Sequence, residues 1–151
     1  SFPLISNLAR QIDLTRFSRS LYLLLTAGIP ISAALELTQE VVIKKEVSRA
    51  IMKSKEMVIS GNKLSEGLKT ARNIFPSIMI KITEAGEKSG SLDKSMLDAS
   101  EYLDYQVSKT LGTLISLLEP IMLIVVGIIV GGMMLAIIAP IYGLIGQVGP
   151  R

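Results

Sequence analysis

The chain has 151 residues, a formal net charge of +3 and neither cysteine nor histidine. This composition excludes thiol chemistry, disulfides, imidazole bases and the usual zinc sites. The small net charge, without any basic run interleaved with aromatic residues, also argues against nucleic-acid binding.

Charged side chains are confined to the first part of the chain. All 13 acidic residues lie at or before Glu119, and Arg151 is the only basic residue beyond it. The preceding segment is long enough for one small domain with a hydrophobic core. Because the chain opens at Ser1 and no apolar signal segment precedes the first amphipathic pattern, we expect it to be part of a longer polypeptide.

The first predicted helix begins at Asp13, a residue type that suits an N-cap. Residues 1–12 form a mixed segment that could lie along a membrane surface or pack on this helix. Gly28 ends the helix in a left-handed conformation. The apolar stripe of this helix comprises Leu14, Phe17, Leu21, Leu24 and Leu25.

Pro30 opens a second helix, because proline is tolerated in a first helical turn. Its predicted buried side contains Ala33, Ala34, Leu37 and Val41. A third helix is predicted over residues 44–60, with Val47, Ala50, Ile51, Met57 and Val58 on its buried side. Its outer face is basic, because Glu46 and Glu56 are outweighed by Lys44, Lys45, Arg49, Lys53 and Lys55.

Ser65 is the predicted cap of a short fourth helix, and Phe75-Pro76 breaks the chain before a fifth. The fifth helix is predicted to bury Ile78, Ile82 and Ala85, and Lys81, Glu84 and Lys88 are spaced for ion pairs on its exposed side. A turn at residues 86–90 precedes a sixth helix, whose apolar side contains Met96, Ala99, Leu103, Val107, Leu111 and Leu114. Its charged residues are mostly acidic: Asp93, Asp98, Glu101 and Asp104.

Residues 120–150 contain no charged side chain. A bilayer core is crossed by roughly 20 apolar residues in a helix, so this run predicts a transmembrane helix, over residues 119–145. Lys94 and Lys109 before the span, against Arg151 after it, predict a cytoplasmic position for the preceding domain. The fold class is thus all-α: a six-helix cytoplasmic bundle whose last helix leads into a C-terminal transmembrane helix.

Small residues in the span indicate a contact with another membrane helix. Gly127 and Gly131 form a GxxxG pattern, which lets two helix backbones approach closely. Glu119 lies at the mouth of the span, where we expect it to face headgroups, water or a partner. The predicted packing residues of the span are Glu119, Pro120, Gly127, Gly131, Gly132, Ala136 and Pro140.

No catalytic or cofactor-binding set emerges from the remaining motifs. Gly86-Glu87-Lys88-Ser89 is not a phosphate-binding loop, because the Walker pattern needs a glycine directly before the lysine and a preceding strand. Glu84 and Glu87 are weak candidates for an acid and base pair or, with Asp93, for a cation site. Solvated charges at a helix end are the simpler interpretation, since no imidazole, serine triad or metal-ligand spacing supports them.

Ordered motifs along the chain resemble the type II secretion F domain. The opening hairpin matches in Arg16-Phe17, Ala27-Gly28-Ile29-Pro30 and Ala34-Leu35-Glu36, and the centre in Gly61, Leu64-Ser65, Leu68, Phe75-Pro76 and residues 86–92. The last helix matches the family pattern in Glu119-Pro120 and Ala139-Pro140-Ile141. Lys88 departs from the pattern, since many members carry a second acidic residue there, and this weakens a cation site at Glu84 and Glu87.

The family comprises inner-membrane platform proteins of type II secretion and type IV pilus machines. The resemblance implies that residues 13–118 are the second copy of the cytoplasmic domain and that residues 146–151 are a short non-cytoplasmic tail. It implies no catalysis. The implied partners are a hexameric assembly ATPase, pilin or pseudopilin, other inner-membrane assembly components and further copies of the protein.

A non-enzymatic scaffold that works by contacts is therefore the leading hypothesis. Two other classes remain open: a subunit of a helical membrane transporter or channel, and a membrane-tethered hydrolase. A transporter would need several spans and intramembrane polar groups, and a hydrolase would need a catalytic set that the composition nearly excludes. The candidate partner-binding residues are Arg49, Lys53, Glu84, Gly86, Glu87, Gly90 and Leu92.

Overall fold

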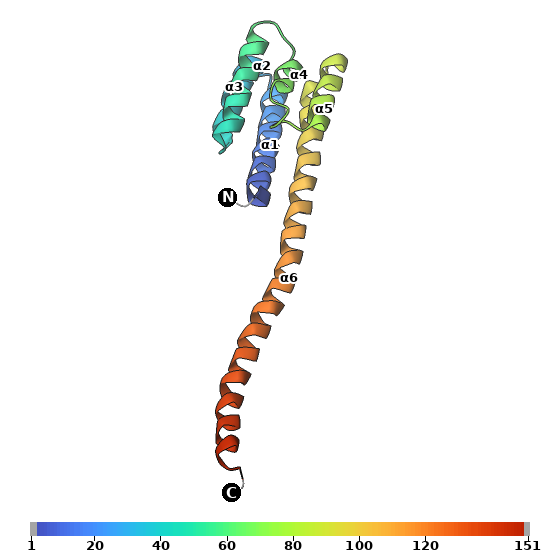
Figure 1. Ribbon diagram of the computed structural model, residues 1–151. Coiled ribbons are helices and arrows are strands. Elements are labelled where there is room, and N and C mark those ends of the chain that lie inside the picture. The colour runs from blue at the N-terminus through green and yellow to red at the C-terminus, as the bar shows by residue number, and fades with distance from the viewer. Residues whose placement is uncertain (1–2, 150–151) are drawn as a thin grey trace. The chain divides into compact units, whose positions relative to one another are not determined.

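The structure, a computed structural model, describes residues 3–149 and is helical in all its regular elements (Figure 1). Ser1 and Arg151, which the sequence analysis named, lie outside the described residues. The all-α prediction is confirmed. The elements are α1 (Pro3–Thr26), α2 (Ile31–Thr38), the single 3₁₀ turn η1 (Gln39–Val41), α3 (Lys45–Ile59), α4 (Leu64–Lys69), α5 (Ser77–Ser89) and α6 (Leu92–Gln147).

Two compact units divide the chain, with the boundary between Thr110 and Leu111 inside α6. The first unit is a helical bundle around one core. Phe17 of α1 and Phe75, just before α5, are fully buried, with ring centroids 6.0 Å apart and planes tilted by 47°. Burying each such ring stabilises the fold by roughly 1.5–3 kcal/mol. Other buried apolar residues come from every α-helix of the bundle: Leu14, Leu21, Ala34, Leu35, Val47, Ile51, Leu68, Met79, Met96 and Leu103.

Gly28 ends α1 as predicted. Its φ is +81°, a left-handed conformation that side chains disfavour. The Gly28 N–H donates to the Leu25 carbonyl and the Ile29 N–H to the Leu24 carbonyl, so carbonyls of the last turn are satisfied. The chain then turns directly into α2 through Pro30.

Asp13 does not begin the first helix, and that prediction is wrong. α1 starts ten residues earlier, at Pro3, so Asp13 lies in its interior and is 1% exposed. Its carboxylate accepts the N–H of Ile43 at 3.0 Å and of Lys44 at 2.7 Å, directly before α3. An aspartate therefore caps as expected, but the helix that it caps is a different one.

Ala34 is buried in α2 as predicted, but the other predicted buried positions of α2 and most of those of α5 are wrong, by about one position. In α2 the buried residues are Ala34, Leu35 and Thr38, and Ala33 and Leu37 are exposed. In α5 the predicted Ile78 and Ala85 are exposed and Ile82 is half-buried, and the buried residues are instead Met79, Ile80, Thr83 and Gly86. A shift of one residue turns a helix by about 100°, and consecutive apolar residues make the two settings look alike in sequence.

The predictions for α3 and α6 fared better. Val47, Ala50 and Ile51 are buried in α3. In α6, Met96, Ala99 and Leu103 are buried, whereas Leu111 is exposed. α6 continues without interruption through Pro120 and Pro140 as one helix of 56 residues.

The second unit consists of the remainder of α6. Every described side chain from Ile115 to Gly149 is exposed within the chain, although most are apolar. α6 is long and apolar enough to cross a membrane, by length and composition. The prediction of a C-terminal membrane helix agrees with this finding.

Candidate functional site

Glu87 joins two helices at the centre of the resembling motifs. It lies on α5, and its carboxylate accepts the Ser65 N–H at 3.1 Å and the Ser65 hydroxyl at 2.5 Å. Ser65 was predicted to cap α4, but α4 begins at Leu64 and Ser65 is its second residue. Glu87 of α5 thus supplies the hydrogen-bond acceptor for the first turn of α4.

Gly86, Gly90 and Leu92 form the corner between α5 and α6. A Cβ on Gly86 would overlap the Ser95 hydroxyl and lie 2.6 Å from the Ser95 Cβ, so these helices cross at this glycine. Gly90 ends α5 with a φ of +70°. Leu92 packs half-buried against the core. Gly86 and Leu92 therefore lie in the packing of the bundle, and Gly90 ends α5 between them.

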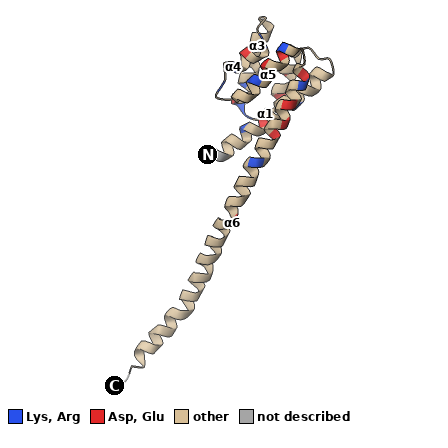
Figure 2. Ribbon diagram, turned by 90° about the vertical axis from the view of Figure 1, so that its right-hand side faces the viewer, with Lys and Arg blue, Asp and Glu red and all other residues tan. Residues whose placement is uncertain are grey.

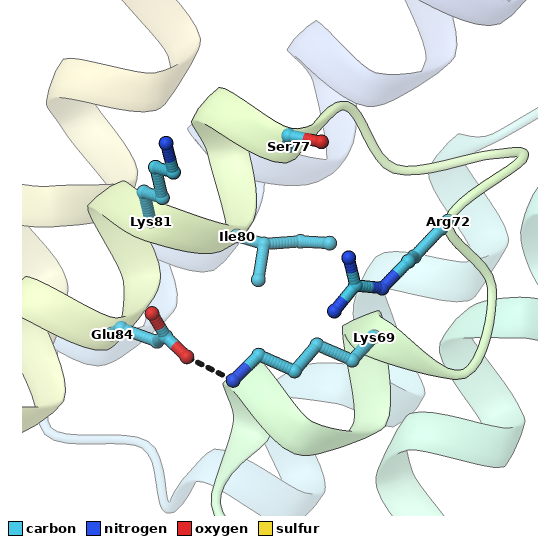
Figure 3. Close-up of a pocket in the computed structure, with 6 residues that line it drawn as sticks. All are labelled: Lys69, Arg72, Ser77, Ile80, Lys81 and Glu84. Carbon is cyan, nitrogen blue, oxygen red and sulfur yellow. Dashed lines mark ion pairs between the residues drawn. The ribbon is translucent and has the colours of Figure 1, made fainter.

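A pocket of about 350 Å³ lies between α4 and α5. Its residues come from the end of α4, the following loop and α5: Lys69, Arg72, Ser77, Ile80, Lys81 and Glu84. Figure 3 shows that the Lys69 ammonium meets the Glu84 carboxylate in an ion pair, while Lys81 extends away from Glu84. Three cations against one carboxylate leave the pocket electropositive.

The charges around Glu84 act on its protonation. The hydrogen bond from Lys69 lowers the pKa of Glu84 below its usual value, and the charges of Lys69, Lys88 and Arg72 lower it further, although partial desolvation opposes this shift. Glu84 is therefore ionised at neutral pH. Sequence reasoning did not pair Glu84 with Lys69, because they lie in different helices and share no periodicity.

Glu84 and Glu87 have separate partners, Lys69 and Ser65 respectively. Within the described residues 3–149, no group of three or more acidic side chains is arranged to hold a metal ion.

Arg49 and Lys53 are both exposed on α3, as expected for a partner-binding face. They line a second, shallower pocket of about 310 Å³. The Arg49 guanidinium donates to the carbonyl of Lys45 in its own helix at 3.3 Å. Its charge thus stays available at the surface.

The predicted packing residues of the membrane helix, from Glu119 to Pro140, are all exposed within the chain. A Cβ placed on Gly127, Gly131 or Gly132 would meet no atom within 4 Å. These glycines therefore leave one region of α6 open to close approach by another helix.

Comparison with known proteins links this architecture to bacterial secretion and pilus assembly. Residues 17–140 match the model of the family described as Type II secretion system (T2SS), protein F. The chain is 32% identical over 147 residues to a type II secretion system protein F from Pseudomonas aeruginosa, covering 97% of this chain and 36% of that protein.

Pilus assembly proteins are similar to the same degree. The chain is 33% identical over 142 residues to a type 4 fimbrial assembly protein PilC from Pseudomonas putida, covering 94% of this chain and 35% of that protein. It is 29% identical over 144 residues to a type IV pilus assembly protein PilC from Thermus thermophilus, covering 95% and 36% of the two chains. The chain thus spans about a third of the length of these relatives.

Proposed function

Because the chain belongs to the type II secretion system protein F family, we propose that it is part of a membrane scaffold in a secretion or pilus machine. The observation that carries this proposal is the family match over residues 17–140, which includes both the bundle and most of the apolar helix. The names of the relatives support both kinds of machine.

In this proposal the scaffold resides in the bacterial inner membrane. Residues 13–118 form its cytoplasmic domain, preceded by a membrane-proximal segment at 1–12. Residues 119–145 cross the bilayer, and 146–151 lie on the outer side. A helix over residues 120–145 is roughly 39 Å long, enough for a hydrocarbon core of roughly 30 Å. Lys94 and Lys109 before the span support the cytoplasmic assignment.

The scaffold acts by contact and not by catalysis. It couples a hexameric assembly ATPase in the cytoplasm to the extraction and polymerisation of pilin or pseudopilin subunits in the membrane. The exposed cations Arg49 and Lys53 on α3 offer a docking face for the motor, because exposed charges favour salt-sensitive, steered association. The open glycine face of α6 offers a contact for pilin or for neighbouring membrane helices.

Site-specific photo-crosslinking tests the motor contact. A photoreactive residue replaces Arg49 or Lys53 in the full-length protein, and Arg19, which is exposed on α1, serves as the matched control. We expect the assembly ATPase to be captured from positions 49 and 53 and not from 19. Capture of neither the ATPase nor any pilin subunit from these positions and from the α6 glycines would overturn the scaffold proposal.

Deletion of the protein gives the complementary test. We expect cells without it to lose surface pili or secretion while the amounts of ATPase and pilin stay unchanged. The double charge reversal Arg49→Glu with Lys53→Glu is expected to reproduce this loss, because the motor no longer meets a basic face. Normal assembly in that variant would exclude the α3 face as the docking site.

A further inference from the structure

Two charged surfaces of the first unit remain without an assigned partner. One is the α4–α5 pocket, defined by Lys69, Arg72, Ser77, Ile80, Lys81 and Glu84. The other, which we call the α6 acidic stripe, consists of Asp98, Glu101 and Asp104. Figure 2 shows acidic residues in red along the first turns of α6.

The α4–α5 pocket has spare positive charge. Lys69 is engaged by Glu84, but neither Arg72 nor Lys81 forms an ion pair with any residue in the part of the chain that the structure describes. Both are exposed, and the nearly buried Ile80 lies between them at the pocket wall. The lowered pKa of Glu84 is a second sign of an electropositive environment. The pocket can therefore accept further carboxylates.

The α6 acidic stripe has spare negative charge. Its three carboxylates are exposed and form no ion pair with any residue between 3 and 149. They recur every three residues, a spacing at which like charges on a helix repel one another. The exposed Tyr102 and Tyr105 lie among them. A cationic partner would relieve this repulsion and cover the two rings.

We propose that the α4–α5 pocket of one copy binds the α6 acidic stripe of a second copy of this chain. The two surfaces have opposite charge, and neither Arg72 and Lys81 nor the three carboxylates form an ion pair within residues 3–149. Their contact is head-to-tail, so each copy uses one surface on each of two neighbours and the copies can close into a ring. The inference goes beyond the proposed function and rests on that function only for its biological role.

Arg72 is the central residue of this contact. Its planar guanidinium can hold a carboxylate such as Glu101 through two parallel hydrogen bonds, and Lys81 can pair with a neighbouring acid as a point charge. Because both surfaces are exposed, the attraction is screened by salt. The contact is therefore expected to weaken as ionic strength rises.

Disulfide crosslinking in the full-length protein reads this contact directly, with any cysteine outside the present chain replaced. One copy with Lys81→Cys and a second, differently tagged copy with Tyr105→Cys, which leaves all three carboxylates in place, are produced together in the native membrane. The matched control carries Lys53→Cys, an exposed lysine on α3, in place of Lys81→Cys. We expect roughly tenfold more mixed-tag dimer with Lys81→Cys than with the control, which corresponds to about 1.4 kcal/mol shared among several exposed charge pairs.

Charge exchange provides the second readout. Arg72→Glu in the first copy should reduce the mixed-tag dimer to the control level, and Asp98→Lys with Asp104→Lys in the second copy should restore it. The proposal would be overturned if the Lys53→Cys control crosslinked equally, or if Asp98→Lys with Asp104→Lys did not restore the dimer. Either result would assign the pocket to another acidic partner or to lipid phosphates. If the dimer is restored but the cells secrete and form pili without the protein, the contact stands and the proposed function alone is refuted.

Discussion

The buried carboxylate of Asp13 links two elements that are 30 residues apart in the chain. It accepts two backbone N–H groups in front of α3. Without it, both donors would be left in the bundle without an acceptor, at a cost of about 1–3 kcal/mol each. We therefore expect Asp13→Ala to lower the free energy of unfolding by about 2–4 kcal/mol, measured by urea denaturation of the chain in detergent.

Two further variants calibrate this effect. Asp13→Asn keeps one acceptor oxygen and should lose less than Asp13→Ala. Asp98→Ala, on the exposed side of α6, should change the free energy of unfolding by less than about 0.5 kcal/mol. A loss for Asp13→Ala no larger than that for Asp98→Ala would refute the capping role.

Glu84 is expected to titrate abnormally. Since the Lys69 hydrogen bond lowers its pKa in the folded state, ionised Glu84 stabilises the fold. This stabilisation is fully present above the unfolded pKa of about 4.5 and disappears as the pH falls through the lower folded value. An NMR titration of the Glu84 carboxyl carbon should give a midpoint below 4.5, and Lys69→Met should raise it. An unchanged midpoint in Lys69→Met would contradict this pairing.

Helix crossings depend on glycine at the α5–α6 corner. Gly86→Ala would place its methyl group against Ser95, so we expect a loss of roughly 1–3 kcal/mol in the free energy of unfolding. Gly112→Ala, in an open helical position, should instead stabilise the chain by up to ~1 kcal/mol.

A double variant tests whether contact with Ser95 causes the loss of stability in Gly86→Ala. Ser95→Gly removes the side chain that the new methyl group meets, so Gly86→Ala with Ser95→Gly should lose less stability than the sum of the two single changes. Both sets of values come from urea denaturation. Strict additivity would show that Gly86 matters for another reason, such as backbone freedom.

Local patterns predicted the helices better than they predicted how the helices pack. Gly28 and Gly90 marked helix ends correctly, because a left-handed glycine is a local preference. The predicted turn at residues 86–90 was too long, since α5 continues through residues 86–89 and ends at Ser89. The buried sides of α2 and α5 were missed, since in short helices neighbouring apolar residues permit two rotations and only tertiary packing decides between them. The Lys69–Glu84 and Asp13–Lys44 contacts join distant segments, and no periodicity within one segment could indicate them.

For the candidate site, too, the sequence predicted local features better than contacts between helices. The motif around Gly86 and Glu87 was recognised as important, but the structure uses these residues to join α4, α5 and α6. The α4–α5 pocket was not predicted, because its walls come from two helices and a loop. Composition, in contrast, sufficed for the membrane helix, since an uncharged run of this length does not depend on packing.

At the scale of the whole molecule, α6 is exposed within the chain from residue 115 to residue 149 and is long and apolar enough to cross a membrane. If the glycine face of α6 contacts another membrane helix, Gly127→Ile with Gly131→Ile should reduce co-purification of the full-length protein with its membrane partners by roughly tenfold, or about 1.4 kcal/mol. The bulky side chains would prevent the close approach of the two helix backbones. Val130→Leu, between the two glycines, is the matched control. Equal co-purification of the double variant and the control would exclude this face as a helix contact.

The central claim is that α6 crosses the membrane while the helical bundle before it stays in the cytoplasm, and cysteine accessibility tests this claim most directly. The chain has no cysteine of its own, so single changes to cysteine at Lys45, Leu135 and Val148 report one compartment each in the full-length protein, once any cysteine outside the present chain is replaced. We predict that a water-soluble maleimide labels Val148→Cys from the outer side of the inner membrane, labels Lys45→Cys only after that membrane is permeabilised, and leaves Leu135→Cys unlabelled. Labelling of Leu135→Cys in intact membranes, or of Lys45→Cys without permeabilisation, would contradict the account.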